Sequence, residues 1–107
     1  MSDIDLGAMM RQAQQMQQQV AYVQNALQKE IVEGSAGAGA VKVKATGDQK
    51  ITAIEIDRSA AEDVDLLQDM IVAAVNNALD AARKLAQERL GSVLPPGLAD
   101  MGKFPGL

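Results

Sequence analysis

The sequence contains no cysteine, no histidine and no tryptophan, and these absences exclude several kinds of chemistry. Without imidazole and thiol groups, the chain cannot use histidine acid–base catalysis, a cysteine nucleophile or disulfides. Zinc sites of the usual nitrogen and sulfur type are excluded for the same reason. The absence of cysteine also suits a reducing cytoplasm, which is where we expect the protein to act.

Aromatic residues are almost as scarce, since Tyr22 and Phe104 are the only two among 107 residues. A chain of this length forms one domain. Its core must be built from alanine, valine, leucine, isoleucine and methionine, most of which bury less area than an aromatic side chain does. Because a small domain hides a modest share of its surface, burial between two copies would offset the shortfall.

Long hydrophobic runs are also missing. The acidic start, MSDID, leads into a glutamine-rich segment, so we expect no signal peptide. No apolar run approaches the roughly 20 residues that span a bilayer, so we expect no membrane partner. The formal net charge of −4 argues against strong electrostatic binding to nucleic acid, because neutralisation of phosphates drives such binding.

A long N-terminal helix is the clearest pattern that is present. Apolar residues follow one another at alternating steps of three and four, which is the spacing of a heptad seam. The seam consists of Leu6, Met9, Ala13, Met16, Val20, Val23 and Leu27. No glycine or proline interrupts residues 8–32, and most of the remaining surface is glutamine. A helix this long with so narrow an apolar stripe requires a partner helix, from its own chain or from another.

The next segment changes to a period of two, which indicates strands. Val41, Val43 and Ala45 alternate with lysines and a threonine, TGDQ follows as a turn, and Ile51–Ile56 continues as a strand. Two such runs joined by a short turn predict a β-hairpin. A short β-branched pair, Ile31 and Val32, closed off by Gly34, can add a third strand.

A second long helix is predicted after residue 58. Ser59 is a plausible N-cap with Glu62 as its capping-box partner, two apolar stripes follow, and Gly91 ends the helix. The order is α-β-β(-β)-α, an α+β fold in which long N- and C-terminal helices flank a small antiparallel sheet. We expect a single domain over residues 1–92 and a flexible tail, rich in proline and glycine, over residues 93–107.

The sequence disfavours three kinds of site. The glycine-rich stretch from Gly34 feeds a strand rather than a helix N-terminus, so it does not fit a phosphate-binding loop. Acidic residues at Glu62, Asp63, Asp65 and Asp69 invite a magnesium or acid–base site, but they fit the electrostatics of a helix start better. The basic stretches lack aromatics, which disfavours stacking on single-stranded nucleic acid. We therefore expect no catalytic residues, no metal and no cofactor.

The whole pattern resembles the YbaB/EbfC family of small bacterial nucleoid-associated proteins. The resemblance rests on MMRQAQQMQQQV, on GSAGAGAVKVKATGDQKITAIEID, on AEDVDLLQDMIVAAVNNAL and on a terminal LPPGL, in that order over roughly residues 6–98. It implies a tweezer-like homodimer whose strands join centrally and whose helices project outward. It also implies duplex DNA binding with loose sequence preference, a location in the nucleoid, an influence on gene expression, and a link to recombination and repair proteins. No catalytic residues or cofactors are implied.

These inferences lead to two hypotheses. In the first, a homodimer contacts the phosphates of duplex DNA, with little sequence preference, through Arg11, Lys42, Lys44, Arg83, Lys84 and Arg89. Strand pairing and burial of Ile31, Val41, Val43, Ile54 and Ile56 would form the dimer interface. In the second hypothesis, the protein is a dimeric scaffold that binds other proteins through its heptad seam and has little affinity for DNA.

Overall fold

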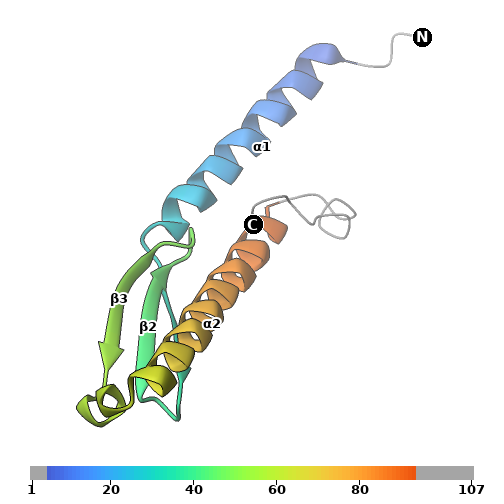
Figure 1. Ribbon diagram of the computed structural model, residues 1–107. Helices are drawn as coiled ribbons and strands as arrows, with labels where there is room; N and C mark the ends of the chain where they lie inside the picture. Colours follow the sequence, from blue (N-terminus) through green and yellow to red (C-terminus); the bar gives the residue numbers. More distant parts are fainter. Residues whose placement is uncertain (1–4, 94–107) are drawn as a thin grey trace.

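The computed structural model describes residues 5–93 and consists of two long helices and a three-stranded sheet (Figure 1). The elements are α1 (Leu6–Leu27), β1 (Ile31–Ala36), β2 (Val41–Thr46), β3 (Ile51–Ile56), a 3₁₀ helix (Arg58–Glu62) and α2 (Val64–Gly91). The predicted α+β fold is confirmed, and the third strand is present over six residues. Of the tail predicted for residues 93–107, all but Val93 lies outside the described residues.

All neighbouring strands of the sheet are antiparallel, in the order β1-β2-β3. The turn between β1 and β2 has positive φ angles at Gly37, Ala38 and Gly39, of 64°, 56° and 91°. Glycine adopts this region at no steric cost. The glycine-rich stretch therefore closes a hairpin, and the expectation that it enters a strand rather than a helix is confirmed.

The core lies between α2 and one face of β1 and β2. Val41, Val43 and Ala45 alternate inward along β2 and are fully buried, as the alternation predicts. From α2, Ala74 and Ala78 pack against them. Small side chains on the helix bring its backbone close to the sheet, which suits a sequence that lacks large aromatic side chains.

Gly34, in the middle of β1, allows the closest approach between helix and sheet. A Cβ atom built at this position would lie 2.2 Å from the backbone nitrogen of Ala78 and 2.6 Å from the carbonyl oxygen of Ala74. The sequence predicted that this strand is closed off by Gly34, but β1 continues through Gly34 to Ala36. Only glycine leaves room for the α2 backbone at this position.

The start of the second helix differs from the predicted one. Ser59 does not cap α2, because residues 58–62 form a 3₁₀ helix and Asp63 accepts the Leu66 N–H through its carboxylate at 3.1 Å. By contrast, α1 ends at Leu27, which is the last residue of the predicted heptad seam, and Ile31 and Val32 pair with β2 as a third strand.

The molecule is elongated, with principal extents of 73 × 23 × 16 Å. Figure 1 shows α1 leaving one end of the sheet, while α2 runs along the sheet. Leu27, at its last turn, is the one buried residue of α1. Within residues 5–93, no helix combines the length and apolarity needed to cross a bilayer.

We predict that Gly34→Ala destabilises the fold by about 1–3 kcal/mol, because the added methyl group must push the α2 backbone away from β1. Urea unfolding followed by circular dichroism at the helical band measures this change.

Gly91→Ala is the matched control, because a Cβ atom there meets no atom within 4 Å. Its free energy of unfolding should match that of the parent chain or rise slightly, since alanine favours a helix. If the two variants had equal free energies of unfolding, the close contact at Gly34 would not determine the stability of the fold.

Candidate nucleic-acid interface

Three of the six predicted phosphate-contacting residues are engaged by acidic side chains. The ion pairs are Lys44 Nζ to Glu55 Oε1 at 3.7 Å, Arg83 Nη1 to Asp80 Oδ1 at 3.0 Å, and Arg89 Nη2 to Glu30 Oε1 at 2.7 Å. A carboxylate this close offsets much of the positive potential that an approaching phosphate would meet. These three cations are therefore weaker candidates than their charge alone indicates.

The other three, Arg11, Lys42 and Lys84, are exposed and form no ion pair within residues 5–93. They lie on three different elements, namely α1, β2 and α2. These three candidates therefore do not belong to a single helix face or strand.

The open face of the sheet, opposite α2, has a balanced charge. Residues directly opposite one another in an antiparallel pair share a face. Lys42 stands opposite Glu55 of β3, and Lys44 stands opposite Glu33 of β1. Each lysine of β2 thus has a glutamate beside it, so this face by itself is not strongly basic.

Arg89 has a structural role at the place where three elements meet. It holds Glu30, which follows α1, against the end of α2. Beside it, the Gly47 N–H donates to the carbonyl of Leu27 at 2.9 Å, which joins the last turn of α1 to the β2–β3 turn. A Cβ atom at Gly47 would lie 2.8 Å from that same carbonyl oxygen. These contacts set where α1 leaves the sheet.

The five predicted interface residues separate into three groups. Val41 and Val43 are fully buried beneath α2 of their own chain, so the structure does not leave them available to a second chain. Ile31 is exposed on the open face of the sheet, opposite the face to which Val32 belongs. Ile54 and Ile56 share the face of Val43 and Val41 but remain 45% and 40% exposed.

β3 is exposed because α2 covers only β1 and β2. The Asn77 side chain, on one flank of α2, donates to the Ser35 carbonyl of β1 at 3.0 Å, so the opposite flank faces β3. At 100° per residue, that flank carries Val72, Val75 and Leu79, which lie on the second of the two apolar stripes of the helix. We call this combined region the open apolar surface; it consists of the exposed Ile51, Ile54, Ile56 and Val72 and the half-buried Val75 and Leu79.

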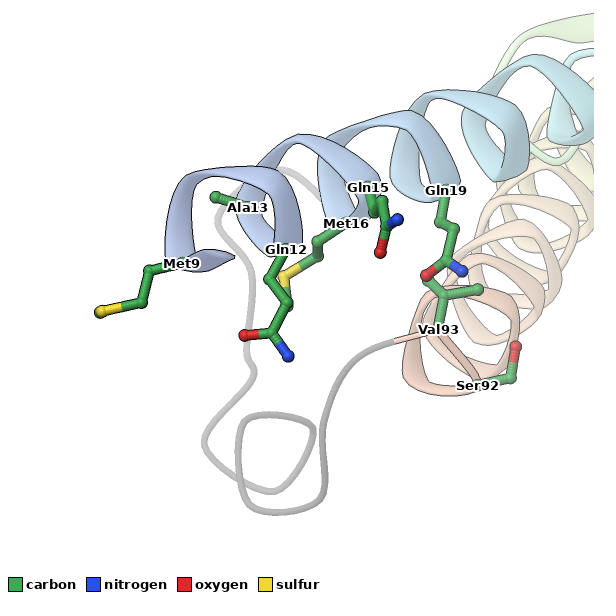
Figure 2. Close-up of a pocket in the computed structure, with 8 residues that line it drawn as sticks. All are labelled: Met9, Gln12, Ala13, Gln15, Met16, Gln19, Ser92 and Val93. Atoms are coloured by element: carbon green, nitrogen blue, oxygen red, sulfur yellow. The ribbon is translucent and has the colours of Figure 1, made fainter. Parts of the chain in front are cut away.

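A groove runs between α1 and the end of α2, and sequence analysis did not predict it. Its volume is about 620 Å³, and Figure 2 shows the residues that line it. They are Met9, Gln12, Ala13, Gln15, Met16, Gln19, Ser92 and Val93. Three of them belong to the heptad seam, which was the only signal that could have indicated this site. The seam is uncovered at its start, where Leu6 and Met9 are 69% and 55% exposed, whereas Met16, Val20 and Val23 are half-buried and Leu27 is buried.

The acidic residues around the start of α2 do not assemble a metal site. Asp63 is used as the N-cap of the helix, and Asp65 lies in its first turn. Over residues 5–93, no three acidic, histidine or cysteine side chains are arranged to hold a metal ion.

Comparisons with known proteins place this geometry in a family. The model of the YbaB/EbfC DNA-binding family matches residues 1–98. A nucleoid-associated protein of Chlorobium limicola is 44% identical over 86 residues, which cover 80% of this chain and 78% of that one. A nucleoid-associated protein of Pelotomaculum thermopropionicum is 44% identical over 105 residues, covering 96% of this chain and 95% of the relative.

A solved structure has the same fold. The crystal structure of an uncharacterised protein of Helicobacter pylori matches with a TM-score of 0.77, covering 86% of this chain and 99% of that one, at 20% sequence identity. The element order, the sequence relatives and the family model agree over almost the whole length. The chain therefore belongs to the YbaB/EbfC DNA-binding family.

Proposed function

We propose that this protein binds duplex DNA as a homodimer, mainly through phosphate contacts and with weak sequence preference. The observation that carries the proposal is the match of residues 1–98 to a family described as DNA-binding. The relatives are named nucleoid-associated proteins, so we place this protein in the bacterial nucleoid, within the cytoplasm. An influence on nucleoid organisation and gene expression, and contact with recombination and repair proteins, stay predictions.

The open apolar surface supports dimerisation. It exposes three isoleucines along β3, which is also an edge of the sheet with one unpaired side. Such an edge is a template for pairing with another strand, and an apolar one favours association. We propose that two copies pair along β3 and cover each other's open apolar surface. This arrangement leaves both α1 helices projecting from the joined sheet.

Phosphate contact is assigned first to Arg11, Lys42 and Lys84, which form no ion pair within the described residues, although Glu55 stands opposite Lys42 in the sheet. A homodimer doubles them, and the doubled set lies on α1, β2 and α2 of each copy. We expect such contacts to position a duplex without reading its bases, because lysine and arginine contacts to phosphate carry no sequence information. Lys44, Arg83 and Arg89 can take part only by giving up a carboxylate partner.

The alternative function is a dimeric scaffold that binds other proteins and has little affinity for DNA. The observation that favours it is the exposed heptad seam on α1, together with a net charge of −4. An acidic chain repels phosphate at long range, whereas a methionine-bearing helix surface adapts to protein partners.

We predict that Lys42→Gln weakens binding to a random-sequence duplex and lowers the slope of log affinity against log salt concentration. Each lost phosphate contact removes about one from that slope, so a dimer loses up to about two. Fluorescence anisotropy titrations at several potassium chloride concentrations measure both quantities.

The control for this experiment is Lys50→Gln, which removes the same charge from a lysine that lies 3.9 Å from Asp48 and stands outside the proposed contact set. Its affinity and salt slope should stay close to those of the parent chain. Equal effects of the two substitutions would refute specific contact at Lys42. Parent binding that does not depend on salt would refute phosphate contact altogether, whereas the absence of measurable binding would favour the scaffold.

We also predict that Ile54→Asp converts the protein to a monomer of 11.3 kDa, because it places a charge in the centre of the open apolar surface. Light scattering coupled to size-exclusion chromatography gives the mass. Ile31→Asp, the same change at an exposed isoleucine on the other sheet face, should remain a dimer. A monomeric Ile31→Asp beside a dimeric Ile54→Asp would move the interface to the open face of the sheet.

A further inference from the structure

We propose that the C-terminal segment, residues 94–107, binds in the groove between α1 and the end of α2 and covers the heptad seam of α1. This inference is independent of DNA binding, because it concerns an interaction of the chain with itself. It names an occupant for the apolar stripe that the described residues leave open.

The described part of the chain ends at the groove. Val93 forms one wall of the groove, and the chain continues from there into residue 94. Figure 2 shows Gln12, Met16 and Gln19 of α1 pointing toward the side on which Val93 lies. The segment thus starts inside the site and needs no long connection to reach it, so the cost of bringing it there is small.

The composition of the segment also suits the groove. It carries five large apolar residues, which are Leu94, Leu98, Met101, Phe104 and Leu107. Its charges, Asp100 and Lys103, cancel. Pro95, Pro96 and Pro105 offer carbonyl acceptors but no N–H donors, and the side-chain amides of Gln12, Gln15 and Gln19 can donate to such acceptors. Apolar residues and proline together suit a groove lined by methionine, alanine and glutamine.

Residues 94–107 are long enough to span the groove. In an extended polyproline-like conformation, the five residues from Val93 to Leu98 span about 15 Å. The ten residues of α1 from Gln19 back to Met9 also span about 15 Å. Leu98 can therefore reach Met9, at the far end of the groove, and the remaining nine residues suffice to continue beyond it toward Leu6.

A second copy of α1 is the competing occupant of the seam. The groove favours the C-terminal segment because Ser92 and Val93 of the same chain already form its second wall. A helix from another chain would have to pack on the same wall from which residues 94–107 continue.

The test uses paired cysteines, because the chain contains none of its own. In the full-length protein, Met9→Cys with Leu98→Cys should form an intrachain disulfide about tenfold faster than Met10→Cys with Leu98→Cys, under the same mild oxidant. The length of chain between the two cysteines is nearly equal in the two variants, so undirected encounters between them would occur at similar rates. Met9 and Met10 are comparably exposed, 55% and 67%, but only Met9 lines the groove. Equal intrachain rates would overturn the proposal, as would disulfides that form only between chains.

A second measurement needs no cysteine. In the unmodified protein treated with dilute peroxide, mass spectrometry should find Met9 oxidised several-fold more slowly than Met10. The variant Leu98→Asp with Phe104→Asp should remove the difference, because the segment would then leave the groove. Equal oxidation in the unmodified chain, or protection of Met9 that persists in the variant, would overturn the proposal.

Discussion

The contact between α2 and the strand pair β1–β2 is the interaction on which the rest of this structure depends. It is a backbone approach made possible by Gly34 on the strand and by Ala74 and Ala78 on the helix. Val41 and Val43 fill the space that remains, and they are the largest side chains that are fully buried. A chain with so few aromatics stabilises its core by closeness of approach, since dispersion attraction falls steeply with distance.

This same contact leaves β3 exposed. A helix with its side chains is about 10–12 Å wide, whereas three strands spaced by about 4.8 Å occupy more than that width. A single helix seated on Gly34 covers β1 and β2 and cannot also cover β3. The isoleucines of β3 and one flank of α2 are therefore available to a second copy, and the proposed dimer follows from the geometry of one helix on three strands.

The charges show why a net charge of −4 does not decide how a DNA-binding family member contacts its ligand. Lys44, Arg83 and Arg89 form ion pairs with nearby carboxylates. The pair of Arg89 with Glu30 also holds the base of α1 against the end of α2. Arg11, Lys42 and Lys84 stay unpaired within residues 5–93. A surface of this kind offers separate points of positive charge, which suits weak contacts to phosphate along a duplex.

The sequence by itself determined the element types, because the periods of 3.6 and 2 and the glycine-rich turn are local signals. The alternation of Val41 and Val43 with lysines also indicated which face of β2 is buried, and the heptad seam indicated a long helix that lacks a partner. Only the structure decided that Asp63 rather than Ser59 caps α2, and which cations are paired. The cap depends on a 3₁₀ helix over residues 58–62, and the pairs of Lys44 with Glu55 and of Arg89 with Glu30 join different elements, which residue spacing alone does not encode. The groove beside Val93 belongs to the same class, since it exists only where α1 comes beside Ser92 and Val93, more than 70 residues further along the chain.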